Sequence, residues 1–307
     1  MAWRIKTWLG GRSLHGFPVW KEVTSWNDLV ECETKLDLID EEWIFRGQAS
    51  DTWPLDSTLQ WYCARYGITG NDVKVIEQQL LIDFWRYYDL YSVGAPPPDD
   101  DTLAWLSLMR HYGTPTRLTD FTRSLFIAAF FALEDLPEDS VVWAVSKTWL
   151  TKATQSAITK MGDPTLLGDW GNRVGDAFDR IFFREPPSRF VSPASPAKMH
   201  ERMAIQQSIF VCPGDVAASF LDNLRAMADS KEKVRPIVIK RAAQNDIMLK
   251  LMRIGIDRSA LFPGLEGFAQ SMRNKIRVFR KLSQMDAAGG RLGPNIEWAR
   301  KRNKNKS

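Results

Sequence analysis

One arginine in this sequence stands where it could bind a phosphate group. Arg46 lies between Phe45 and Gly47, directly after a short apolar run. A planar guanidinium can donate two parallel hydrogen bonds to phosphate oxygens, and a glycine without a Cβ lets a ligand or another backbone come close. The alternative is a structural arginine, buried and paired with a carboxylate such as that of Asp120. Arg46 is therefore a candidate for binding an anion or for stabilising the core.

A second candidate group consists of His111, Tyr112 and Gly113. The spacing before it predicts a helix over 102–111, and Gly113 suits the left-handed residue that ends many helices. A helix C-terminus favours the protonated form of a histidine, and an imidazole can hydrogen-bond a ribose hydroxyl or exchange a proton near neutral pH. The alternative is that His111 only caps the last carbonyl groups of its helix.

The segment that follows combines hydroxyl groups with two charges. Its polar residues are Thr114, Thr116, Arg117, Thr119, Asp120 and Thr122. Because side chains alternate along a strand, a strand over 116–121 would place Thr116 and Asp120 on one face and Arg117 on the other. Thr116 or Asp120 could then face a pocket, whereas the hydroxyl of Thr122 suits the cap of the next helix.

A pair of glutamines, Gln206 and Gln207, precedes an apolar run over 208–212. Amide side chains both donate and accept, so either one could bind a nucleobase or the amide of nicotinamide. A surface position explains one of them equally well. No glutamate stands at these two positions. Glu201 is the nearest carboxylate in the sequence, and Glu185 and Asp179 are alternatives in the unpatterned stretch.

Several common sites are missing from the sequence. It has no HExxH or HxH pair for zinc, no GxSxG elbow, and neither GxGxxG nor GxxxxGK[ST] for nucleotide phosphates. Cys32, Cys63 and Cys212 are odd in number and far apart, which argues against a disulfide framework or a thiolate zinc site. The longest apolar run, 125–133, is shorter than the about 20 residues that a membrane span needs. We therefore expect no metal, no membrane partner and a cytoplasmic protein.

The net charge of +4 is distributed unevenly along the 307 residues. Residues 272–307 hold 11 basic and 2 acidic residues, a net charge of +9, which leaves 30 basic and 35 acidic residues and a net charge of −5 for residues 1–271. A polycationic segment binds phosphates without reading bases, so this end is a candidate contact to nucleic acid. The alternative is that the basic residues of 273–281 form a solvated helix face.

Both helices and strands are needed to position these groups. Apolar residues at helical spacing predict helices over 25–39, 59–66, 73–91, 102–111, 123–135, 242–254 and the later part of 259–278. Aromatic and β-branched runs predict strands over 42–47, 116–121, 140–145, 208–212 and 235–240. Strict strand–helix alternation is absent, which favours an α+β fold, a single mixed α/β domain around a small sheet. The expected divisions are a loose N-terminal arm over 1–18, the domain over 19–270 with an unpatterned stretch at 151–200, and a basic helix and tail over 271–307.

Four segments share a pattern in their order and spacing. They read WIFRGQASDTWPLDSTL at 43–59, LSLMRHYGTPTRLTDFTRSLFIAAFFAL at 106–133, RMAIQQSIF at 202–210 and SALFPG at 259–264. Together they resemble the FRG domain, a bacterial family named for its Phe-Arg-Gly motif, across residues 19–270. Ser208 departs from the family pattern, which usually has glycine there, and Phe121 stands alone where the family usually has an aromatic pair. The resemblance implies a role in phage defence or in a toxin system.

The same residues are similar in order to the site of ADP-ribosyltransferases. Those enzymes place an arginine or histidine at the end of a first strand, a hydroxyl-rich strand before a helix, and a glutamate or glutamine near a later strand. The resemblance implies NAD as a substrate, with Arg46 on its phosphates or nicotinamide ribose and with His111 and Tyr112 on the nicotinamide side. A carboxylate or glutamine would stabilise the oxocarbenium-like centre as nicotinamide leaves.

The site implied by this resemblance has two sets of residues and no metal. The catalytic candidates are Arg46, His111 and Gln207, and the NAD-binding candidates are Arg46, Gly47, Gln48, Tyr112, Thr116, Arg117, Asp120, Thr122 and Gln206. Since no glutamate stands at positions 206 and 207, a second function stays open: a sensor module that binds a nucleotide or nucleic acid without turning it over. The sequence names neither the acceptor nor an antitoxin or other partner protein.

Overall fold

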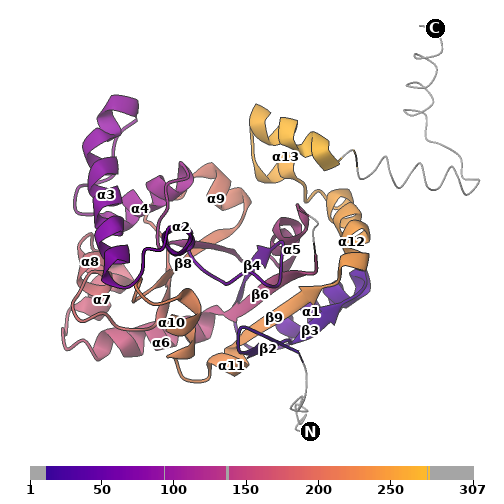
Figure 1. Cartoon of the computed structure of the whole chain (residues 1–307), viewed down its shortest axis with the longest axis horizontal. Coiled ribbons are helices and arrows are strands. Elements are labelled where there is room, and N and C mark those ends of the chain that lie inside the picture. Colours follow the sequence, from indigo (N-terminus) through magenta and orange to yellow (C-terminus); the bar gives the residue numbers. More distant parts are fainter. Residues whose placement is uncertain (1–11, 93, 136–137, 275, 277–307) are drawn as a thin grey trace, which may run out of the picture. The chain divides into compact units, whose positions relative to one another are not determined.

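A mixed sheet organises the part of the chain that the computed structural model describes, which is residues 12–92, 94–135, 138–274 and 276. Within these residues seven strands follow the order β3-β9-β6-β4-β5-β8-β7 (Figure 1). Their bounds are β3 (Lys21–Val23), β4 (Trp43–Gln48), β5 (Thr119–Thr122), β6 (Ser140–Ser146), β7 (Val191–Ala194), β8 (Ser208–Pro213) and β9 (Val234–Ile239). Only β3 and β9 pair in parallel, and the other neighbours in this sheet are antiparallel. The predicted α+β class is confirmed.

Helices fill most of the connections between these strands. They are α1 (Trp26–Asp37), α2 (Thr58–Arg65), α3 (Asn71–Tyr91), α4 (Thr102–His111), α5 (Leu125–Leu133), α6 (Lys147–Thr159), α7 (Leu166–Asn172), α8 (Ala177–Phe182), α9 (Glu201–Ile205), α10 (Phe220–Arg225), α11 (Ser230–Lys233), α12 (Arg241–Arg253) and α13 (Arg258–Leu261). The first helix is capped by Ser25, whose side chain accepts from the Asp28 N–H. No helix among the described residues is long and apolar enough to cross a bilayer.

The FRG strand, β4, has a glycine because a helix backbone lies against it. The apolar helix α5 packs on β4 and β6, and its side chains are almost all buried. A Cβ added to Gly47 would collide with the carbonyl oxygen of Ala128 and would lie 2.7 Å from the amide nitrogen of Ala132. Neither atom can move without moving the helix. Gly47 therefore allows close approach of a backbone, one of the two alternatives that the sequence left open.

We expect the Gly47→Ala variant to be destabilised by about 1–3 kcal/mol or more, because overpacking would push α5 off the sheet. Denaturant unfolding measures the loss. Gly168→Ala is the matched control, since Gly168 lies inside α7 and a Cβ there meets nothing within 4 Å. That control should be neutral or stabilising by about 0.5–1 kcal/mol. Equal unfolding midpoints for the two variants would contradict the packing account.

Three expectations from the sequence need correction. Residues 13–18 are not a loose arm, because β1 (Ser13–Leu14) and β2 (Phe17–Pro18) form a hairpin with two buried apolar side chains. The stretch 151–200, which lacked a clear pattern, contains most of α6 together with α7, α8 and β7. Its prolines are compatible with this because Pro193 lies in β7, an edge strand. The strand predicted over 116–121 begins only at Thr119, after a turn that buries Thr116.

The described chain divides into two compact units, 1–244 and 245–307. The sheet and all seven of its strands belong to the first unit. The second contains most of α12, together with α13 and a further helical stretch over 265–274. Apart from residues 272–274 and 276, the basic segment 272–307 lies outside the described residues. The expected boundaries at 18 and 270 and the contact to nucleic acid stay predictions.

Candidate functional site

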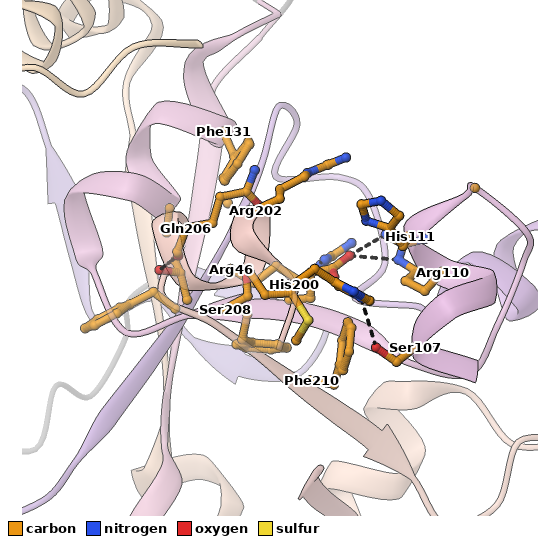
Figure 2. A pocket seen from close by; sticks show the side chains of 18 residues that line it. Arg46, Ser107, Arg110, His111, Phe131, His200, Arg202, Gln206, Ser208 and Phe210 are labelled. Atoms are coloured by element: carbon orange, nitrogen blue, oxygen red, sulfur yellow. Dashed lines mark hydrogen bonds and ion pairs between the residues drawn. The ribbon is translucent and has the colours of Figure 1, made fainter. Parts of the chain in front are cut away.

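A cleft of about 420 Å³ opens where three adjacent strands, β4, β5 and β8, meet the ends of α4 and α9. Its lining residues are Phe45, Arg46, Gly47, Ser107, Arg110, His111, Gly113, Asp120, Phe121, Thr122, Ala128, Phe131, His200, Arg202, Met203, Gln206, Ser208 and Phe210. Arg110 and His111 come from one side and Gln206 from the other, with Arg46 and His200 between them (Figure 2). The volume lies within the range of about 300–1,000 Å³ that is usual for small-molecule sites.

The register of the strands brings hydroxyl groups and aromatic rings to this cleft. Thr122 pairs with Phe45 of β4 on one side and with Ser208 of β8 on the other. Asp120 pairs with Phe210 in the same ladder. Directly opposed residues in a sheet project to the same face, and side chains two apart on a strand do so as well. One face of β5 and β8 therefore carries Asp120, Thr122, Ser208 and Phe210 into the cleft wall.

Arg46 lies partly buried in this cleft with one nitrogen unpaired. Its Nη1 atom donates to the backbone carbonyl of Asp120 at 2.8 Å. Its buried Nε atom has no hydrogen-bond partner among the described residues. Burial and the positive charge of Arg110 lower the pKa of Arg46 to about 10, although the negative charge of Asp120 acts in the opposite direction. A buried donor without a partner is costly, so the site is suited to an anionic ligand that would bind it.

The structural alternative proposed for Arg46, a pair with the Asp120 carboxylate, is wrong in its details. Arg110 of α4 takes that carboxylate instead: its Nε and Nη2 atoms donate to Oδ2 of Asp120 at 2.8 and 2.5 Å. The Nη1 atom of Arg110 also bonds to the Thr58 hydroxyl at 3.0 Å, which fixes the guanidinium. Among the described residues, Arg46 thus has a neutral carbonyl as its only hydrogen-bond acceptor.

Two of the three histidines of the chain meet at the edge of the cleft. The rings of His111 and His200 lie 4.6 Å apart between centroids, tilted by 35°, and Nε2 of His200 is 3.5 Å from the Ser107 hydroxyl. Burial lowers the pKa of both histidines, and the charges of His200 and Arg202 lower that of His111 further. The expectation that the helix end favours protonated His111 is therefore wrong, because these effects outweigh the dipole.

Lowered histidine pKa values predict the direction of a pH effect on stability. The unfolded chain binds protons at these histidines near pH 6.5 and below, whereas the folded chain binds them only at lower pH. Their contribution to stability is thus fully present above pH 6.5 and is lost as the pH falls from there through the lower pKa values of the folded chain. We expect the thermal midpoint of the wild type to fall more between pH 7.5 and 5.5 than that of the His111→Gln/His200→Gln double variant. An equal fall in thermal midpoint for the two proteins would contradict the lowered histidine pKa values.

The charges and rings of the cleft favour a flat anionic ligand. Its lining residues include three arginines and two histidines but a single carboxylate, that of Asp120. Desolvated arginines bind phosphate oxygens well. The half-buried Phe131 and the buried Phe45, Phe121 and Phe210 are also among the lining residues, and an aromatic side chain offers a face on which a nucleobase or pyridine ring can stack. A phosphorylated compound with a planar ring satisfies both features.

The two glutamines have different surroundings. Gln206 is buried and lines the cleft, and its backbone carbonyl accepts from the Thr122 hydroxyl at 2.7 Å. Gln207 has a positive φ of 49° and is exposed, and its backbone carbonyl accepts from the Arg123 N–H. It is not among the lining residues. The structure therefore brings Gln206 to Arg46 and His111 but does not bring Gln207.

Four of the other predicted NAD-binding residues are not in the cleft lining, and their contacts are structural. Gln48 accepts from the Trp143 indole at 2.6 Å and donates to the Pro54 carbonyl. Tyr112 is 68% exposed, Thr116 is fully buried, and Arg117 forms a buried ion pair with Glu77. Gly47, Asp120 and Thr122 do line the cleft. The predicted capping role of Thr122 is wrong, since Ser124 is the N-cap of α5.

Three basic residues of the cleft were missed by sequence reasoning. Arg110, His200 and Arg202 line the cleft, yet none was singled out. Arg110 precedes His111 directly, so the matched segment contained it. His200 could have been found because the chain has only three histidines. Nothing in the local pattern near Pro193 and Pro196, however, indicated that the loop would return to α4.

Comparison with known proteins places part of this chain in a family. Residues 41–140 match the model of a family described as FRG domain. This stretch includes β4, α4, β5 and α5, and so it supplies Arg46, Arg110, His111 and Asp120. Neither the curated proteins nor the solved structures gave a match.

Proposed function

Because the chain contains an FRG domain, we propose that its cleft binds NAD and that the protein is an ADP-ribosyltransferase-like enzyme. One observation carries this proposal: Arg46 on β4, Thr122 on β5 and Gln206 before β8 line one cleft on three adjacent strands. These are the three positions, in chain order, that the resemblance assigns to such a site. The proposed setting is a bacterial phage-defence or toxin system.

NAD has the chemistry that the cleft is suited to bind. Its pyrophosphate is an acceptor for the unpaired Nε of Arg46 and for the guanidinium of Arg202, which also lines the cleft. The nicotinamide amide can both donate to and accept from the buried side chain of Gln206. Phe131 and Phe210 provide apolar surface for the rings. The lowered histidine pKa values leave His111 and His200 able to accept hydrogen bonds from ribose hydroxyls near neutral pH.

The proposed reaction breaks the bond between C1′ of the ribose and the nicotinamide nitrogen. Nicotinamide leaves with the electron pair of that bond and thereby loses its positive charge. Positive charge then develops on the ribose, where the carbonyl oxygen of an amide such as that of Gln206 can stabilise it. An acceptor nucleophile forms the new bond to C1′ and gives up a proton.

A second candidate function is a sensor that binds the nucleotide without cleaving it. The observation in its favour is that the cleft has no glutamate where the resemblance expects one, and that Gln206 cannot take up a proton from an attacking nucleophile. The same positive charge and aromatic lining would serve binding alone.

The two functions are separated by incubating the wild-type protein with NAD labelled in the nicotinamide ring and, separately, in the adenosine. An enzyme releases free nicotinamide and transfers adenosine label to protein, DNA, RNA or water. A sensor binds NAD in equilibrium dialysis but releases no nicotinamide. Absence of both binding and release would rule out the two candidates together.

A further inference from the structure

The cleft contains one carboxylate whose second oxygen is unused. Both hydrogen bonds from Arg110 to Asp120 end on Oδ2. The other oxygen, Oδ1, has no hydrogen-bond partner in the described part of the chain, and the side chain is 41% exposed. The buried pair of Arg117 with Glu77 differs, because there the guanidinium engages both carboxylate oxygens. Asp120 is thus fixed in place by one oxygen and open to a ligand through the other.

The position of Asp120 relates it directly to the phosphate-binding arginine. Its backbone carbonyl accepts from Arg46 at 2.8 Å, and its charge raises the pKa of that arginine against burial. Its side chain shares a face of β5 with Thr122. It also lies opposite Phe210 of β8, the strand that Gln206 precedes. Asp120 therefore stands in the same wall as the residues that the proposed function assigns to NAD.

We propose that Asp120 is a catalytic residue. It is the general base that takes the proton from the acceptor, which the amide of Gln206 cannot do. This inference rests on the proposed function. In the step, the acceptor hydroxyl or a water oxygen forms a bond to C1′, the C1′–nicotinamide bond breaks, its electron pair goes to nicotinamide, and the acceptor proton goes to Oδ1 of Asp120. Arg110 orients the carboxylate through Oδ2, which leaves Oδ1 directed to the acceptor.

The test measures nicotinamide release by wild type and by Asp120→Asn, which keeps an oxygen for Arg110 but removes the base. Loss of a general base costs typically about 10²–10⁴-fold in rate, so kcat should fall by that factor with KM little changed. The control is Asp222→Asn, which removes a carboxylate paired with Arg225 outside the cleft lining and should leave kcat unchanged. Thermal melting confirms that each variant is folded.

Azide distinguishes a base from a structural carboxylate. Azide is an anionic nucleophile that has no proton to lose, so it should restore nicotinamide release to Asp120→Ala and form a ribosyl azide. It should give no such rescue to Arg46→Ala, which lacks a binding group. If Asp120→Asn retains kcat, or if azide fails to rescue Asp120→Ala, this inference falls while the proposed function stands. If the wild type binds NAD but releases no nicotinamide, both fall.

Discussion

The Arg117→Met variant should lose about 3–5 kcal/mol of unfolding free energy, because it leaves a buried carboxylate without its partner. Arg117 and Glu77 are each about 1% exposed, and the Nε atom of Arg117 donates to Oε1 of Glu77 at 2.6 Å. The guanidinium also donates to the Phe182 carbonyl at 3.1 Å and lies 4.8 Å from the ring centroid of Phe183. Burial alone would lower the pKa of Arg117, but the interaction with Glu77 outweighs this effect and raises the pKa of the arginine.

Urea unfolding of matched variants tests this prediction. Arg123→Met is the control, since Arg123 makes an exposed ion pair with Glu42, and such pairs contribute about 0–1 kcal/mol. The double variant Arg117→Met/Glu77→Met should be more stable than Arg117→Met alone, because no buried charge then remains. A loss for Arg117→Met no larger than that for Arg123→Met would show that the buried pair is not what holds α3 to this part of the fold.

Binding of NAD should weaken about 10- to 100-fold in Arg46→Gln. Hydrogen bonds to a charged group contribute about 1.5–3 kcal/mol, and each 1.4 kcal/mol changes a dissociation constant about tenfold. Because the amide nitrogen of glutamine stands where Nε of the arginine was, the change removes the positive charge and the hydrogen bond from Nη1 to the Asp120 carbonyl. Isothermal titration with NAD, at fixed ionic strength, measures the change.

The control for this loss is the removal of one positive charge from a different basic cavity. A cavity of about 230 Å³ is lined by Arg123, Lys147 and Arg173 among others, and shares no lining residue with the first. Lys147→Gln removes one positive charge there and should leave NAD affinity unchanged. Equal weakening by the two variants would mean that NAD responds to the overall charge of the protein and not to the cleft.

Local signals in the sequence predicted the elements that carry the site. The strand predicted over 42–47 and the helix predicted over 102–111 agree with β4 and α4 to within one residue at each end. They could be predicted because caps and hydrophobic spacing are local properties. The helix predicted over 123–135 corresponds to α5, which is shorter by two residues at each end. The first two of these segments supplied Arg46 and His111 to the cleft.

Long-range partners could not be predicted in the same way. Arg117 reads locally as a candidate ligand because it lies among threonines, yet its partner Glu77 is 40 residues away on α3. His200 reaches His111 only because the loop before α9 folds back to the end of α4. Strand alternation also failed at Thr116 and Arg117, since β5 begins after them. Tertiary contacts decided these roles, and one sequence does not contain them explicitly.

The most direct test of the central claim is a crystal structure of the protein with an NAD analogue whose bond between ribose and nicotinamide cannot be cleaved. The account predicts a phosphate oxygen within hydrogen-bond distance of Nε of Arg46, the pyridine ring near Gln206, and Oδ1 of Asp120 facing C1′. An analogue whose phosphates lie on Lys147 and Arg173 of the second cavity, with the cleft empty, would contradict it.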